Sequence, residues 1–310
     1  MAWHPQSPVE LIAGTPAGGG QDRPARALIA ALDRLGLVGQ PMTLTNVPGK
    51  GGGNGWDRLL THRGDAHWLA INSPTIITNR LLGVSDYDHR ALTPIANLYT
   101  EYIAFVVRAD SPLREAADFT ARLSRDAAGC RVALATALGN INHMALGRIA
   151  AHAGADVRRI PINVFDSALY AVDDVIAGRA EVGAITAVSA VKAMQSGQVR
   201  AIAVSAPQRL PALFAAVPTW REQGIDCVIG TWRGVIAAAG ISTEQVAFWT
   251  EALRAVARTP EWNAELQAQY WANTYCDGAE LGAMLDREDE VMGALLRQLG
   301  LIPGCSRFIS

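Results

Sequence analysis

Short apolar segments alternate with segments of helical periodicity along most of this 310-residue chain. Such alternation is typical of strand–helix–strand units around mainly parallel sheets, so it restricts the fold to the α/β class. The order of elements starts again after about residue 105, which predicts two lobes. The expected strands cover residues 9–13, 42–46, 68–72, 93–98, 103–108, 131–135, 157–161, 182–185 and 201–205.

Helical patterns separate these strands in the first part of the chain and replace them beyond Trp232. Half of the residues are apolar, which is enough to bury the cores of two lobes. The expected helices cover residues 23–35, 56–62, 141–153, 167–177, 244–258, 262–269 and 280–299.

Charge and hydropathy exclude several kinds of partner. The 27 basic and 29 acidic side chains nearly cancel and are scattered, so nucleic acid and membrane surfaces are not expected partners. No apolar run approaches the ~18 residues that a membrane span needs, so the chain is not expected to be membrane-embedded. Residues 1–5 also lack the charged and apolar regions of an export leader.

Cysteine and histidine spacing argues against a metal site. Cys130, Cys227, Cys276 and Cys305 form no metal-binding or dithiol motif, and the six histidines are dispersed, so neither a metal nor a cofactor is expected. One or two disulfides stay possible in an oxidising compartment, with no pairing indicated. An enzyme is not expected either, because the sequence has no GxSxG motif, no Cys/His pair in matching loops and no cluster of carboxylates.

Two glycine-rich segments each follow an expected strand and precede an expected helix: TPAGGGQDRPAR (residues 15–26) and NVPGKGGGNGW (residues 46–56). Ligands of open α/β sheets bind at these strand ends, where helix amides without intrahelical partners attract anions. Glycine lets those amides approach a carboxylate or phosphate. Asp22 is expected as the N-cap, with Pro24 in the first turn. Plain tight turns are the alternative, and neither nucleotide-binding glycine motif is matched.

At these residues the chain resembles the substrate-binding proteins of tripartite tricarboxylate transporters, a Bug-type or TctC-like family. The pattern P-x-G-G-G-x-D-x-x-A-R is met from Pro16 to Arg26, and N-x-P-G-x-G-G-x-x-G is met from Asn46 to Gly55. The segments YDHRALTPIANL, GQVRAIAVSAPQRLPAL, VPTWREQG and TWRGVIAAAG follow in the family's order. The resemblance covers nearly the whole chain.

The resemblance implies a type II periplasmic binding fold, with two doubly wound lobes joined by crossover strands and a ligand cleft between them. Lobe 1 is expected over residues 1–103 and 232–310, and lobe 2 over residues 104–231. The implied function is periplasmic capture of a small organic di- or tricarboxylate by lobe closure, with delivery to the transporter's membrane permease. A C4 to C6 dicarboxylate is the first expectation, with citrate-like acids and aromatic dicarboxylates as the next ones. A monomer is expected, with its export leader absent from this sequence. The alternative is a sensor that reports the same acid to a membrane signalling partner.

The candidate ligand-binding residues come from both lobes. In the glycine segments they are Ala17, Gly18, Gly19, Gly20, Asp22, Pro48, Gly51, Gly52 and Gly53, and elsewhere they are Asn72, Ser73, Thr136, Asn140, Thr186, Ser189 and Arg233. Asn72 and Ser73 also fit plain turn residues, Thr136 and Asn140 also fit helix caps, and Arg233 also fits a solvated arginine on a hinge.

Two positions of the second lobe depart from the family or fit it less clearly. His143 matches the family's pattern, but a histidine in a first helical turn is usually packed and hydrogen-bonded. Ile185 stands where many relatives have an acid. An ammonium group buried without a charged partner is costly, so this replacement disfavours an amino-acid ligand, unless Glu101 or Asp166 restores the missing charge.

Overall fold

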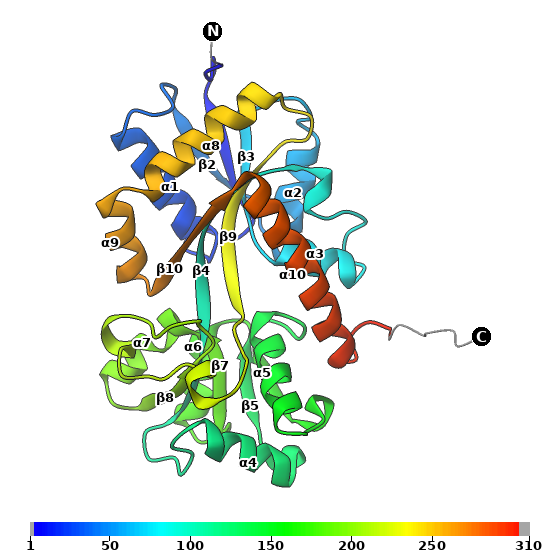
Figure 1. Ribbon diagram of the computed structural model, residues 1–310, viewed down its shortest axis with the longest axis vertical. Coiled ribbons are helices and arrows are strands. Elements are labelled where there is room, and N and C mark those ends of the chain that lie inside the picture. The colour runs from blue at the N-terminus through cyan, green and yellow to red at the C-terminus, as the bar shows by residue number, and fades with distance from the viewer. Residues whose placement is uncertain (1–2, 304–310) are drawn as a thin grey trace, which may run out of the picture. The chain divides into compact units, whose positions relative to one another are not determined.

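The computed structural model describes residues 3–303, which form two compact units (Figure 1). Three chain segments contribute to each unit, so neither is continuous in sequence. Unit 1 comprises Met1–Thr100, Trp232–Ala268 and Asn273–Val291. Unit 2 comprises Glu101–Thr231, Gln269–Ala272 and Met292–Ser310.

The sheet of unit 1 has three parallel strands at one side, with β1 between β2 and β3 (Figure 1). The neighbour of β3 is antiparallel to it, and the strand order is β2-β1-β3-β9-β4, with β10 also pairing with β4. These strands are β1 (Val9–Ala13), β2 (Met42–Asn46), β3 (Trp68–Asn72), β4 (Thr93–Arg108), β9 (Gly230–Ala237) and β10 (Trp271–Asp277). β4, β9 and β10 contribute residues to both units.

Helices with one apolar face cover this sheet, and α1 packs against α8. Two buried tryptophans fix them by indole hydrogen bonds: Trp56 Nε1 donates to Ile71 O at 3.0 Å, and Trp249 Nε1 donates to Ala66 O at 2.9 Å. The helices are α1 (Asp22–Arg34), α2 (Gly53–Leu60), α3 (Thr75–Leu81), α8 (Thr243–Ala257), α9 (Pro260–Ala268) and α10 (Gly278–Gln298), with 3₁₀ turns η1 (Lys50–Gly52) and η2 (His89–Ala91).

Unit 2 has a second sheet in which β5 is parallel to both of its neighbours, β6 and β7. The second half of β4 is antiparallel to β7 and β8. The strands are β5 (Val132–Ala135), β6 (Ile162–Phe165), β7 (Val182–Thr186) and β8 (Val199–Val204). The helices are α4 (Ala116–Asp126), α5 (Ile141–His152), α6 (Ala168–Ile176) and α7 (Ala187–Gln195), and η3 to η6 are Ala127–Gly129, Val157–Arg159, Ala212–Phe214 and Arg221–Gln223.

The α/β class is confirmed, and several element predictions are wrong. The strands expected over 93–98 and 103–108 are one strand, β4, because its polar middle is paired: Asn97 Nδ2 donates to Thr274 O of β10 at 2.8 Å. The strand expected over 157–161 is the turn η4, whose Arg158 N–H is capped by the Asp156 side chain. Beyond Trp232 the chain also contains strand β10 rather than helices alone.

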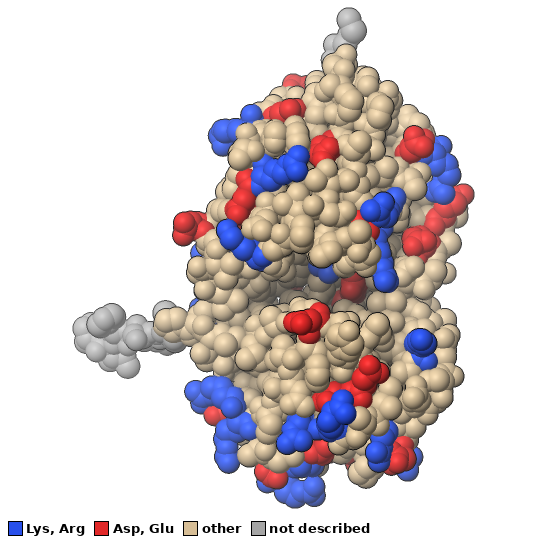
Figure 2. Space-filling view, turned by 180° about the vertical axis from the view of Figure 1, so that it is seen from behind, with Lys and Arg blue, Asp and Glu red and all other residues tan. Residues whose placement is uncertain are grey.

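On the face drawn in Figure 2, Lys and Arg are interspersed with Asp and Glu, and neither sign forms a continuous patch. Within residues 3–303, every helix is too short or too polar to cross a membrane.

The three cysteines in the described part of the chain are free thiols, so they form no disulfide with one another. Burial raises the pKa of Cys130 and of Cys227 to about 12, and that of Cys276 to about 11. All three are therefore neutral, unreactive core residues at ordinary pH. Cys305 and the C-terminal residues 304–310 lie outside the described residues.

Candidate functional site

The carboxyl ends of three strands meet along one edge of the unit 1 sheet, next to the middle of β9. Ala13 at the end of β1 pairs with Asn46 at the end of β2, and β3 runs parallel to β1 on its other side. Gly234 of the antiparallel strand β9 pairs with Asn72 at the end of β3. The connections after β1, β2 and β3 therefore leave the same edge, next to Arg233.

Glycine loop 1 (residues 14–21) is held in shape by the buried carboxylate of Asp22. This carboxylate accepts hydrogen bonds from Gly18 N at 2.8 Å, from Asn46 Nδ2 at 2.9 Å and from Arg26 Nε at 2.9 Å. The Arg26 guanidinium is the main cause that lowers the pKa of Asp22 to about 2. Asp22 is thus ionised and occupied by the loop itself.

The N-cap prediction for Asp22 is wrong. The cap position is Gln21, and Asp22 is the first helical residue, so its side chain bonds back to the loop amide of Gly18. Gln21 is the residue that sequence reasoning missed here. Its side chain is buried and accepts a hydrogen bond from Gly14 N at 2.7 Å. The sequence signal for Gln21 was its position, because it is a polar residue directly after three glycines.

Glycine loop 2 (residues 47–53) depends on left-handed backbone, with φ of 61° at Gly51 and 107° at Gly52. Asn79 of α3 supports it, because Asn79 Nδ2 donates to Lys50 O at 2.8 Å. Pro48 accepts a hydrogen bond from Asn54 Nδ2 at 2.8 Å through its carbonyl. The loop conformation is therefore fixed by glycine geometry and by two asparagine side chains.

The two glycine loops touch. A Cβ on Gly14 would overlap with Gly52 Cα, and a Cβ on Gly52 would lie 2.8 Å from Gln21 Nε2. The structure confirms that the two loops, each at the start of a helix, lie next to each other. Ligand binding by these loops stays a prediction.

Internal hydrogen bonds use several of the predicted amide donors. Gly18 N donates to Asp22, Gly19 N to Pro16 O, Gly52 N to Gly49 O and Gly53 N to Lys50 O. Among residues 3–303, the amides of Ala17 and Gly20 have no acceptor. Loop 1 thus presents these two donors, while the four bonded amides maintain the shape of the loops.

Three more candidate residues lie at the same sheet edge: Asn72 at the end of β3, Ser73 directly after it, and Arg233 of β9. Asn72 is buried and accepts a hydrogen bond from Ser73 N at 2.9 Å through Oδ1. Ser73 is fully buried, and its hydroxyl has no hydrogen-bond partner in the described part of the chain. Arg233 reaches loop 1: its Nη2 lies 3.2 Å from the position that a Cβ on Gly20 would occupy.

In unit 2, the predicted residues lie at the carboxyl ends of β5 and β7. Thr136 follows β5 and is exposed. Asn140 caps α5: its Oδ1 accepts from His143 N at 3.1 Å, and its Nδ2 donates to Ala135 O at 2.6 Å. Thr186 Oγ1 and Ser189 Oγ, which start α7, are hydrogen-bonded at 2.9 Å. The helix-cap alternative thus accounts for both polar ends of Asn140.

His143 and Ile185 are packed inside unit 2. His143 Nδ1 accepts a hydrogen bond from Gly139 N at 3.0 Å, and burial lowers the pKa of its ring to about 4. The ring is therefore neutral at pH 7 and carries its proton on Nε2. Ile185 is fully buried in the core with Ala104 and Val204. An acidic side chain at position 185 would be buried, and its negative charge would destabilise the fold without a buried partner.

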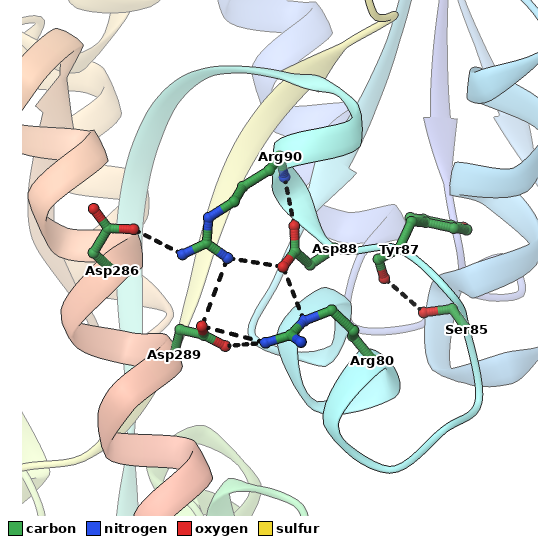
Figure 3. Close-up of polar contacts among 7 residues, drawn as sticks. All are labelled: Arg80, Ser85, Tyr87, Asp88, Arg90, Asp286 and Asp289. Carbon is green, nitrogen blue, oxygen red and sulfur yellow. Dashed lines mark hydrogen bonds and ion pairs between the residues drawn. The ribbon is translucent and has the colours of Figure 1, made fainter.

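An ion-pair network in unit 1 connects α3, η2 and α10 (Figure 3). Asp88 Oδ2 lies 2.9 Å from Arg80 Nε and 2.8 Å from Arg90 Nη1. The two arginines continue to α10, with Arg80 Nη2 3.0 Å from Asp289 and Arg90 Nη2 2.8 Å from Asp286.

The same connection reaches glycine loop 2 through Tyr87. Its hydroxyl donates to Asp57 Oδ1 of α2 at 2.7 Å, and Lys50 Nζ of loop 2 lies 3.2 Å from Asp57 Oδ2. The segment that carries Tyr87 and Asp88 therefore ties the second loop to the ion-pair network. Each of these contacts falls within unit 1.

Known proteins share both the sequence pattern and the fold. Residues 26–301 match the model of the "Tripartite tricarboxylate transporter family receptor". The protein BugT of Bordetella pertussis is 26% identical over 242 residues, which is 76% of this chain and 72% of BugT.

Solved structures give the same result. A TctC solute-binding protein from Polaromonas is 27% identical, covers 96% of this chain and 100% of its own, and superposes with a TM-score of 0.80. A Rhodopseudomonas palustris protein solved with adipate is 20% identical, covers 97% of this chain and 99% of its own, and has a TM-score of 0.81. The fold is thus the two-lobed α/β fold of periplasmic binding proteins, and the chain belongs to the tripartite tricarboxylate transporter receptor family, TctC, whose members are solute-binding receptors and not enzymes.

Proposed function

We propose that this protein works in the periplasm, where it captures a small organic acid and delivers it to the membrane permease of a tripartite tricarboxylate-type transporter. Di- and tricarboxylates are the expected ligands. The two lobes expected from the sequence, residues 1–103 with 232–310 and residues 104–231, close on the acid as it binds. The protein acts as a monomer.

The observation that carries this proposal is the pair of touching glycine loops at one sheet edge. Loop 1 offers the amides of Ala17 and Gly20, and the Arg233 guanidinium lies beside Gly20. A carboxylate placed there receives main-chain donors at the start of α1, the positive end of its helix dipole and a cationic side chain. Arg233 has five N–H donors, so it can bind a carboxylate while keeping other contacts.

The carboxylate of Asp22 has a supporting role in this proposal. A second negative charge in contact with a bound carboxylate would repel it, but Asp22 is paired with Arg26 and bonded to the Gly18 amide. Its charge is therefore balanced locally, and its contribution is to hold loop 1 open toward the ligand. Ser73 adds a buried hydroxyl at the same edge.

A thermal-shift and calorimetric panel tests the proposal. Carboxylic acids should raise the melting temperature and bind with 1:1 stoichiometry, while the matched amides should not, because the amides lack the negative charge. Small-angle scattering should show a smaller radius of gyration with ligand. If amides and acids stabilise the protein equally, recognition of a carboxylate is refuted.

A further inference from the structure

Gln21 is anchored to glycine loop 1 at both ends of the residue. It is the cap residue of α1 and is 3% exposed. Its Oε1 accepts a hydrogen bond from Gly14 N at 2.7 Å, and its main-chain N–H donates to Thr15 Oγ1 at 3.2 Å. The backbone and the carbonyl oxygen of the side chain are therefore both held in place by the start of loop 1.

The amide nitrogen of Gln21 lies beside glycine loop 2. A main-chain N–H can only donate, so the side-chain atom that faces Gly14 is the carbonyl oxygen, and Nε2 takes the other position. Gly52 leaves the space for it, because a Cβ on Gly52 would lie 2.8 Å from Gln21 Nε2. The amide nitrogen thus lies at the junction of the two loops.

This nitrogen is a donor that the protein itself leaves unused. In the part of the chain that the structure covers, Gln21 Nε2 has no acceptor within hydrogen-bond distance. It is not one of the fully buried polar atoms that lack a partner there, so it reaches the protein surface. Because the rest of the side chain is already fixed, binding an acceptor at Nε2 costs little side-chain freedom.

Donors alone surround this part of the sheet edge. The amides of Ala17 and Gly20 can only donate, and so can the Arg233 guanidinium beside Gly20. Gln21 Nε2 adds a fourth group of the same kind. A ligand group that meets only donors must carry acceptors on every side, which a carboxylate does and a primary amide, with its own NH2, does not.

We propose that Gln21 determines the specificity of the site, because its Nε2 donates a hydrogen bond to a carboxylate oxygen of the bound acid and leaves an N–H group of a ligand without an acceptor. This inference rests on the proposed function and names a side chain that reads the ligand there. Each group that it invokes, from Ala17 to Gly52 and Arg233, belongs to unit 1.

Gln21→Glu tests the contact with almost no change of shape. One carboxylate oxygen of the glutamate can still accept from Gly14 N, while the other replaces the Nε2 donor by a charged acceptor. Calorimetry and ligand-observed NMR titrations of the full chain at pH 8 compare the variant with the wild type for succinate, adipate, succinamide and adipamide. Both acids should bind at least ~10-fold more weakly to the variant, and both diamides at least ~3-fold more tightly, because their NH2 gains a charged acceptor.

Gln245→Glu is the matched control in the same unit. Its Oε1 also accepts a main-chain hydrogen bond, from Ser242 N at 2.7 Å, at the start of α8. Helix α8 follows the end of β9 at Ala237, which pairs with Leu69 and so lies away from the strand-end loops. The control introduces the same charge and should leave all four affinities unaltered. Circular dichroism and urea unfolding verify that both variants fold.

A second variant keeps the test decisive if Gln21→Glu does not fold. Gln21→Met has a side chain of similar length, without a donor and without a charge. Loss of the donor should lower the preference for each acid over its diamide at least ~3-fold relative to the wild type. A change of loop shape alone would weaken the acid and its diamide by the same factor, which would overturn the inference.

The outcomes separate this inference from the proposed function. If Gln21→Glu binds the acids like the wild type, or weakens acids and diamides alike, Gln21 does not contact the ligand. If the acids weaken while the diamides are unaltered, the new charge acts from a distance, and the contact is again refuted. Carboxylate capture stands in each of these cases. If the wild type binds no acid better than its diamide, both are wrong.

Discussion

Gly14 and Gly52 pack against each other without room for a Cβ between them, although they belong to different loops and lie far apart in the sequence. This contact brings together the loops that follow β1 and β2. Gln21 lies on the same junction, with its side chain hydrogen-bonded to Gly14 N and next to Gly52. The loops therefore form one continuous surface, and substitutions at the junction alter both.

Gly20 is the position where a side chain should block the ligand with least damage to the loop. At Gly19 a Cβ would meet Pro16 O at 2.9 Å, and Gly52 has a φ of 107°, so a side chain at either position would disturb its loop. At Gly20 a Cβ meets only Arg233 Nη2, at 3.2 Å. Gly20→Val should lower carboxylate affinity at least ~10-fold with a small change in melting temperature.

Gly282→Ala is the matched control for this substitution. A Cβ at Gly282 meets nothing within 4 Å, and the residue lies inside helix α10. The change should stabilise the fold by about 0.5–1 kcal/mol and leave carboxylate affinity unaltered. Calorimetry and urea unfolding of both variants provide the comparison, and equal affinity in wild type and Gly20→Val would remove loop 1 from the site.

Arg233 should contribute a charged hydrogen bond to the bound carboxylate. Arg233→Gln keeps donors but removes the charge, so carboxylate affinity should fall by about 1.5–3 kcal/mol, which is roughly 10- to 150-fold. Arg233→Lys should recover part of the loss. The exposed Arg258, at the end of α8, supplies the control Arg258→Gln, which should change nothing. An unaltered dissociation constant for Arg233→Gln would assign Arg233 a role other than ligand contact.

Asp88 should matter far more for stability than Asp286, although both pair with Arg90. The Asp88 side chain is 9% exposed and also pairs with Arg80, whereas Asp286 is 67% exposed. Asp88→Asn should reduce the free energy of unfolding by about 2 kcal/mol, and Asp286→Asn by less than about 1 kcal/mol. Urea unfolding measures both, and similar losses would contradict the central place of Asp88 in the network.

His143 should make the protein less stable in mild acid. Its folded-state pKa of about 4 lies below the unfolded value of 6.5, so the unfolded chain binds more protons between these values. The free energy of unfolding should fall by at most about 3 kcal/mol from this residue as pH decreases from 6.5 to 4. His89, whose pKa burial also lowers, adds its own contribution.

The variant His143→Gln isolates the first of these effects. Glutamine can still accept the Gly139 amide but does not titrate, so its unfolding free energy should depend less on pH between 6.5 and 4. Equilibrium unfolding of the variant and the wild type at several pH values gives the difference. Parallel pH profiles would mean that His143 keeps an ordinary pKa in the folded protein.

The periodicity of apolar residues was enough to determine the α/β class and the positions of β1, β2 and β3, because buried strands and one-sided helices must repeat apolar residues at fixed intervals. It failed at β4, where Asn97 and Thr100 interrupt the apolar pattern. These residues are buried because Thr274 of β10 supplies their hydrogen bonds, and a partner so distant in the sequence leaves no local signal.

The glycine loops show the same division within the candidate site. The sequence alone indicated which residues lie at strand ends and where bare backbone is needed, since both follow from local chemistry. Only the tertiary structure decided which amides are available for a ligand. Some of them already donate hydrogen bonds to the Asp22 carboxylate and to the carbonyl oxygens of Pro16 and Gly49. The tertiary structure alone also placed Arg233 beside Gly20, since strand pairing brings these two distant residues to one sheet edge.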